Sequence, residues 1–121
     1  SEQNEQLVSP VFDAMEIGAL ASDGAAFRPH IVWFGEAVPL IGDAIELVKQ
    51  ADIVIVIGTS LVVYPAAGLL EYVKRDAALF VVDKKIPASP FIHNAKCFEM
   101  PATKGIEQLL HELVVQPGFI Q

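Results

Sequence analysis

An apolar strand that runs into a small polar turn constrains the fold of this chain most. Asp52–Ile57 (Asp-Ile-Val-Ile-Val-Ile) is predicted to be a fully buried β-strand, and Gly58-Thr59-Ser60 follows it directly. A helix is expected from Pro65, because the missing N–H of proline costs nothing in a first helical turn. A strand, a glycine-containing turn and a helix in this order are typical of α/β proteins that present backbone N–H groups to a phosphate. The same residues also suit a plain connection between a strand and a helix.

The rest of the chain alternates predicted strands and helices after an irregular start. Expected strands are His30–Phe34, Ala78–Val82 and the short edge strand Lys96–Glu99, and expected helices are Pro39–Gln50, a helix from Pro65 to about Arg75, and Thr103–Val115. Ile86–Pro90 is expected to be a loop because it holds two prolines. With right-handed crossovers, this order predicts an α/β chain: a partial, doubly wound, Rossmann-like three-layer fold with a mostly parallel sheet.

The predicted helices carry finer expectations. Glu71 is set to pair with Lys74 or Arg75. Thr103 is the expected N-cap of the last helix. The apolar face of that helix is expected to consist of Ile106, Leu109, Leu110 and Leu113.

Composition limits the class of protein. The chain has 121 residues, which is one domain or less, and a net charge of −7, which argues against a nucleic-acid partner. Its single cysteine, Cys97, excludes an internal disulfide and a cysteine-based zinc site within these residues, and fits a reducing, cytoplasmic location. Ile53–Leu70 is uncharged, but a buried strand, loop and helix explain it better than a membrane span, so no membrane partner is expected.

A second motif lies one predicted helix upstream of the Gly58 turn. Arg28–Glu36 reads Arg-Pro-His-Ile-Val-Trp-Phe-Gly-Glu. From its residues alone, Val32–Glu36 is an amphiphilic strand that ends in a glycine, Gly35, where the backbone of a ligand could approach. It is equally compatible with a core strand that packs Trp33 inside, and both descriptions can hold together.

Taken together, Arg28–Glu36 and Gly58-Thr59-Ser60 resemble the sirtuin family of NAD-dependent protein deacylases, and only the C-terminal part of its catalytic domain. The residues Leu61–Gly68 also look like the family's continuation of the Gly-Thr-Ser turn. The resemblance implies that Gly58, Thr59 and Ser60 contact NAD. It also implies that Val32, Trp33, Phe34, Gly35 and Glu36 line the cleft in which an acyl-lysine peptide or protein substrate adds as a β-strand.

Further cofactor contacts follow from the resemblance. Asp83, at the end of the third expected strand, stands where sirtuins usually show asparagine, and a carboxylate there can accept bonds from ribose hydroxyls. Lys84 and Lys85 belong to the same predicted cofactor segment, whose alternative is a solvated loop. Ala102 matches the small residue that lies beside the adenine in the family.

The resemblance covers roughly Phe27–Val115, and the family's pyrophosphate-binding segment, general-base histidine and four zinc cysteines belong to motifs not found in this sequence. We therefore assign no catalytic role to His30, His93 or His111. We also identify no metal ligand in this chain, although zinc is expected in the family. Residues 1–27 are expected to be a remnant of the small zinc-type domain or a connecting segment, and residues 28–121 the C-terminal half of the NAD-binding domain.

The chemistry that the resemblance implies is acyl transfer from lysine to ADP-ribose. The carbonyl oxygen of the acyl-lysine attacks C1′ of the nicotinamide ribose and nicotinamide leaves. We expect the 121 residues alone to be inactive. The alternatives are a non-catalytic nucleotide-binding or regulatory module, and a half-protein that needs a partner chain or associates with itself.

Overall fold

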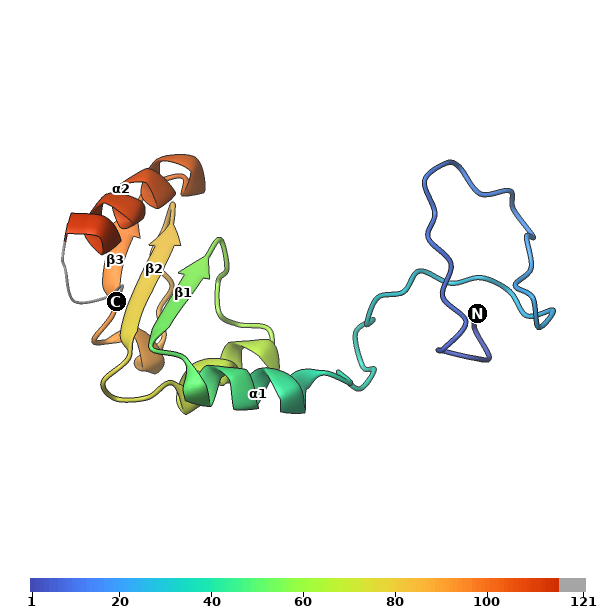
Figure 1. The fold of residues 1–121 in the computed structure, drawn as a ribbon, viewed down its shortest axis with the longest axis horizontal. Helices are drawn as coiled ribbons and strands as arrows, with labels where there is room; N and C mark the ends of the chain where they lie inside the picture. The colour runs from blue at the N-terminus through green and yellow to red at the C-terminus, as the bar shows by residue number, and fades with distance from the viewer. Residues whose placement is uncertain (116–121) are drawn as a thin grey trace. The chain divides into compact units, whose positions relative to one another are not determined.

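The computed structural model describes residues 1–115, and the chain divides into two compact units, residues 1–37 and 38–121. The helices and strands all lie in the second unit (Figure 1). In chain order they are α1 (Ile41–Gln50), β1 (Ile53–Ile57), the 3₁₀ helix η1 (Ala66–Tyr72), β2 (Ala78–Asp83), the 3₁₀ turn η2 (Pro90–Ile92), β3 (Lys96–Glu99) and α2 (Ala102–Val115). The first unit consists of turns, bends and one isolated antiparallel bridge between Leu20 and Ala26.

Within the described residues the sheet has three parallel strands in the order β1-β2-β3. Ile53 aligns with Ala78 at one end of the β1–β2 pair, and Ile57 aligns with Val82 at the other. Since every connection returns the chain to the same end of the sheet, the carboxyl ends of all three strands meet at one edge. The prediction of an α/β, Rossmann-like chain with a parallel sheet is confirmed.

Two apolar clusters cover the two faces of the sheet, as the alternation of side chains along a strand requires. On one face, Val56 and Val81 pack against Leu70 of η1 and Ile92 of η2. On the other face, side chains of β2 and β3 pack against Leu109 of α2; these are Phe80, Val82 and Phe98. Figure 1 shows α2 beside β2 and β3, and α1 lies against η1. The layers therefore follow the three-layer plan expected from the sequence.

The strand expected at His30–Phe34 is wrong. These residues form bends and a turn, in which the N–H of Glu36 donates to the carbonyl of Trp33 at 3.1 Å. A strand needs a neighbour for its backbone hydrogen bonds, and β-propensity alone supplies none. Here the backbone bonds within its own loop instead.

The expectation that Asp52–Ile57 is fully buried is also wrong, although its extent as a strand is confirmed within one residue. Ile55 is 42% exposed and Ile57 41% exposed. Both side chains point to the face that carries α2, and α2 contacts β2 and β3. The apolar composition of β1 indicated burial on both faces, but within the described residues no helix covers this part of the sheet.

Two details of the helices differ from the prediction. The helix after Pro65 is a 3₁₀ helix that ends at Tyr72, and Lys74 pairs with Asp52 (Nζ to Oδ1, 2.5 Å) and not with Glu71. Because the helix is shorter, Lys74 lies beyond its end, within reach of the Asp52 carboxylate that precedes β1.

The last helix also begins one residue earlier than predicted, at Ala102, so Thr103 lies inside its first turn and is not the N-cap. Of its expected apolar face, Leu109 is buried and Leu113 packs against the core, whereas Ile106 and Leu110 are exposed. In the first turns of α2 the buried position belongs to Gly105 and not to Ile106, which the periodicity had placed on the apolar face.

Candidate functional site

The predicted cofactor residues lie at the carboxyl edge of the sheet, which we define as Gly58–Ser60, Asp83–Lys85 and Ala102. The N–H of Gly58 donates to the carbonyl of Val82 at 3.0 Å, so the turn after β1 is bonded to the end of β2. The N–H of Met100 donates to the carbonyl of Asp83 at 2.9 Å and bonds the end of β3 to the end of β2. Three segments far apart in the sequence are thereby held at one edge.

The turn after β1 needs a glycine for its backbone conformation. Gly58 has φ +63°, in the left-handed region that favours glycine, and an added Cβ would meet no atom within 4 Å. The hydroxyl of Thr59 accepts a hydrogen bond from the N–H of Leu61 at 3.2 Å, which holds the following backbone. Gly58, Thr59 and Ser60 are all exposed. The turn therefore presents small polar groups and open space to a ligand.

Asp83 is the last residue of β2, and one of its carboxylate oxygens accepts a hydrogen bond from the backbone. Its Oδ1 accepts the N–H of Lys85 at 3.0 Å, and the residue is half-buried. Glu99 is its register partner on β3, so two carboxylates occupy neighbouring positions at this edge. Lys84 and Lys85 are exposed. A fixed carboxylate at the end of a parallel strand suits acceptance of hydrogen bonds from ribose hydroxyls.

The position of Ala102 depends on a close contact between α2 and β2. Ala102 is half-buried and is the first residue of α2. One turn later, a Cβ added to Gly105 would lie 2.2 Å from Cγ1 of Val82. Glycine therefore lets the helix approach β2 and brings its first turn to the carboxyl edge. The sequence analysis missed Gly105, although a glycine inside a helical pattern is a signal for such an approach.

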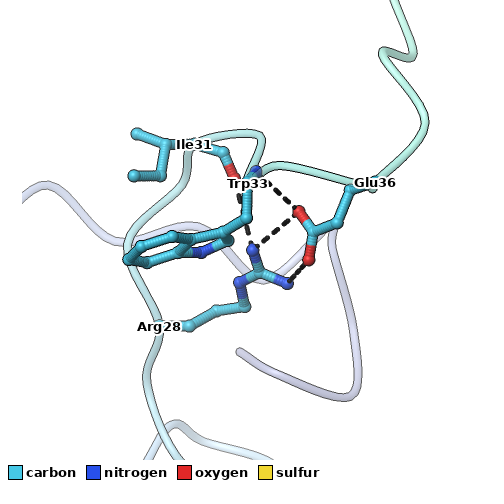
Figure 2. Close-up of polar contacts among 4 residues, drawn as sticks. All are labelled: Arg28, Ile31, Trp33 and Glu36. Carbon is cyan, nitrogen blue, oxygen red and sulfur yellow. Dashed lines mark hydrogen bonds and ion pairs between the residues drawn. The ribbon is translucent and has the colours of Figure 1, made fainter.

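The predicted substrate residues Val32–Glu36 lie in the first unit and form a loop closed by an ion pair (Figure 2). Nη1 of Arg28 donates to Oε1 of Glu36 at 2.9 Å, and Nη2 donates to Oε2 at 3.0 Å. The hydrogen bond from Arg28, and then that from the N–H of Trp33, hold the pKa of Glu36 below its ordinary value. The same pairing raises the pKa of Arg28. The structure thus gathers the cofactor residues at one edge and the substrate residues in a separate loop.

The comparisons with known proteins bear on both groups of residues. The model of the Sir2 family matches residues 2–65, which is more than half of the chain. The chain belongs to the Sir2 family. The match includes the whole Gly58 turn, and it begins well before Phe27, where the resemblance was expected to start from the sequence.

Relatives of this Sir2 chain are NAD-dependent protein deacylases. It is 42% identical over 114 residues to one from Helicobacter pylori, covering 94% of this chain and 50% of the relative. It is 45% identical over 103 residues to one from Bacteroides thetaiotaomicron, covering 85% of this chain and 44% of the relative. The chain spans about half the length of the curated relatives that it matches.

Solved Sir2 structures share the fold. A Sir2 homologue mutant in complex with ADP ribose has a TM-score of 0.72 at 30% identity, covering 92% of this chain and 47% of that one. A Sir2–p53 peptide–NAD⁺ structure has a TM-score of 0.63 at 33% identity, covering 80% of this chain and 42% of that one. A further structure, Sir2Tm bound to a propionylated peptide, has a TM-score of 0.62 at 33% identity, covering 81% of this chain and 43% of that one.

Residues 1–115 hold neither a candidate metal site nor a helix that could span a membrane. Over residues 1–115, no group of three or more His, Cys, Asp or Glu side chains could hold a metal ion. In the same part of the chain, no helix is long and apolar enough to cross a membrane. Ile53–Leu70, the uncharged stretch, is divided between β1, a loop and η1.

Proposed function

We propose that this chain is the NAD-binding C-terminal portion of a sirtuin-type protein-lysine deacylase. The observation that carries the proposal is the convergence of Gly58–Ser60, Asp83 and Ala102 at the carboxyl edge of a parallel sheet, where α/β proteins bind nucleotides. The deacylase names of its relatives and the ADP-ribose in a structural neighbour support it. Glu36 and the loop around it are proposed to contact the acyl-lysine substrate.

The groups at the carboxyl edge fit the adenosine-ribose and phosphate part of NAD. Thr59 and Ser60 offer uncharged hydroxyls, and the open space at Gly58 lets a ligand approach the backbone. The Asp83 carboxylate accepts bonds from ribose hydroxyls, while its bond from Lys85 fixes its orientation. When bound, NAD supplies the ribose carbon that receives the acyl-lysine oxygen as nicotinamide leaves. The residues of this chain bind and orient the two substrates.

Binding of ADP-ribose to the 121-residue chain, measured by calorimetry, tests the proposal. We expect binding weaker than low micromolar, since this chain carries only part of the proposed site, and a further loss in Ser60→Ala or Asp83→Ala. Asn94→Ala is the matched control, because Asn94 is an exposed polar residue just before β3, at the amino end of the strands. Equal binding by all four proteins, or none by the natural chain, would contradict the proposal. We also propose that this chain alone releases no nicotinamide from NAD and an acyl-lysine peptide, and detectable release would refute that part.

A second candidate is a half-protein that needs a partner chain or associates with itself. The exposed Ile55 and Ile57 on β1 favour it, because an apolar sheet face of this kind is ordinarily covered. Sedimentation analysis of the purified chain tests self-association through this face, which Ile55→Thr together with Ile57→Thr should reduce. A monomer at all concentrations would refute self-association.

A further inference from the structure

Four consecutive large apolar side chains are exposed in the loop between Arg28 and Glu36. Ile31, Val32, Trp33 and Phe34 are between 46% and 96% exposed, with Phe34 at the upper end. A run of exposed apolar residues costs solubility and is ordinarily retained only where it binds something. Such a surface binds well only if it is already ordered, because ordering it on binding reduces affinity.

The loop is ordered by a small hydrogen-bond network, which we call the Arg28 clasp. It consists of the two parallel bonds from Arg28 to Glu36, a bond from Nη2 of Arg28 to the carbonyl of Ile31 (3.3 Å), and a bond from the N–H of Trp33 to Oε2 of Glu36 (3.0 Å). Figure 2 shows these bonds meeting at the guanidinium and the carboxylate. Both ends and the middle of the loop are therefore tied to one ion pair.

Exposed ion pairs usually contribute little to stability, but this one differs in geometry. Its two bonds are bidentate, and two backbone groups complete a network, which are the conditions under which such pairs matter. A lysine at position 28 would keep the positive charge. Its single ammonium nitrogen could not replace the two planar guanidinium nitrogens that donate in parallel to Glu36 and to the carbonyl of Ile31. The clasp thus depends on the guanidinium and not on charge alone.

The clasp also determines which groups the loop can offer to a ligand. The N–H of Trp33 is bonded to Glu36, and its carbonyl accepts the N–H of Glu36. These two backbone groups are engaged within the loop, whereas the indole of Trp33 and the ring of Phe34 remain exposed. In this state the loop meets a partner through aromatic side chains rather than through the backbone of Trp33.

We propose that Arg28 is a positioning residue for the substrate: through Glu36 it holds the loop in the shape in which Trp33 and Phe34 contact an acyl-lysine peptide. The inference rests on the proposed function, which assigns this loop to the peptide. It adds a role for Arg28, to which the proposed function gives none. The apolar acyl chain and the stem of the lysine are the parts of the peptide that two aromatic rings suit.

The single tryptophan of the chain makes the clasp directly measurable. Fluorescence of Trp33 is followed during acrylamide quenching and during titration with an acyl-lysine peptide that lacks aromatic residues; the unacylated peptide serves as the ligand control. The variants are Arg28→Gln, Arg28→Lys, and the reversed pair Arg28→Glu with Glu36→Arg. Lys49→Gln is the matched control, because Lys49 makes an exposed ion pair with Glu46 in α1.

We expect Arg28→Gln to raise the quenching constant of Trp33 and to weaken acyl-peptide binding roughly two- to fivefold. Arg28→Lys should show most of this loss, the reversed pair should recover part of it, and ADP-ribose binding should stay within experimental error in every variant. Unchanged quenching and unchanged peptide affinity in Arg28→Gln would overturn the proposal. If the natural chain binds no acyl-lysine peptide at all, the assignment of the loop to the substrate fails first, whereas normal peptide binding by Arg28→Gln refutes the positioning role alone.

Discussion

Gly105→Ala should destabilise the second unit because it removes the close approach of α2 to β2. The added Cβ would lie 2.2 Å from Cγ1 of Val82 and 3.3 Å from Cγ of Met100. Real Cβ contacts are essentially never shorter than 3.0 Å, so one partner must move. Val82 is 0% exposed and its β-branched side chain is stiff in χ1, so the helix has to move.

The size of the effect follows from two opposing contributions. Overpacking a well-packed core costs about 1–3 kcal/mol, and a contact this short with a stiff, fully buried side chain belongs at the upper end. Alanine is better than glycine inside a helix by about 1 kcal/mol. The net loss in the free energy of unfolding is therefore about 2 kcal/mol, which lowers the Tm by roughly 8–16 °C for a unit of this size.

Urea and thermal unfolding followed by circular dichroism measure this loss, and the chain offers a matched control. Gly42 lies in α1, and a Cβ added there meets no atom within 4 Å, so Gly42→Ala should be neutral or stabilising by up to about 1 kcal/mol. Combining Gly105→Ala with Val82→Ala should cost less than the sum of the two single changes, since the second removes the atom in contact. If Gly105→Ala matches Gly42→Ala in stability, the packing argument is refuted.

Three further predictions concern the site. Asp83→Asn should change the Kd for ADP-ribose by no more than about threefold. It should reduce the ratio of the Kd for a 2′-phosphorylated nucleotide to the Kd for ADP-ribose about tenfold, because the carboxylate that repels the phosphate is removed. An unchanged ratio of the two Kd values in calorimetry would contradict this prediction. Gly58→Ala should lower the free energy of unfolding by about 1–2 kcal/mol, since φ is +63°, and unaltered urea denaturation would count against it. The Arg28 clasp should open as the pH falls through the lowered pKa of Glu36, below the ordinary value of 4.5, while staying intact above it. Quenching of Trp33 reports that opening, and a midpoint above 4.5, or the same transition in Glu36→Gln, would be inconsistent with it.

Elements whose formation depends on local pattern were predicted well from the sequence. The runs around Val81 and Cys97 form β2 and β3 within one residue of their expected bounds, and the amphipathic pattern around Ile45 forms α1. Apolar β-branched runs bounded by turn residues, and a 3.6-residue period, each specify a structure with little help from the rest of the chain. The convergence of Gly58 and Asp83 at one edge follows from parallel strands alone.

Features that depend on a distant partner were not predictable in the same way. Val32 and its neighbours have β-propensity, but within the described residues no strand pairs with them, and the Arg28 clasp folds them into a loop. Ile57 is expected to be buried because the apolar composition of Asp52–Ile57 is typical of a strand covered on both faces. Its side chain is exposed, because coverage of each face depends on tertiary packing that the local sequence does not encode. Gly105 carries an available signal, since a glycine in a helix is costly unless close packing requires it.

A chemical-shift map of the ¹⁵N-labelled chain titrated with ADP-ribose would decide whether the carboxyl edge of the sheet binds the nucleotide. We predict that the perturbed backbone amides cluster at Gly58–Ser60, at Asp83–Lys85 and around Ala102, and that the amides of Ala77, Ala78 and Asn94, at the amino ends of the strands, stay unchanged. Perturbations that cluster at the amino ends of the strands, or none at millimolar ADP-ribose, would contradict the assignment of this edge to NAD.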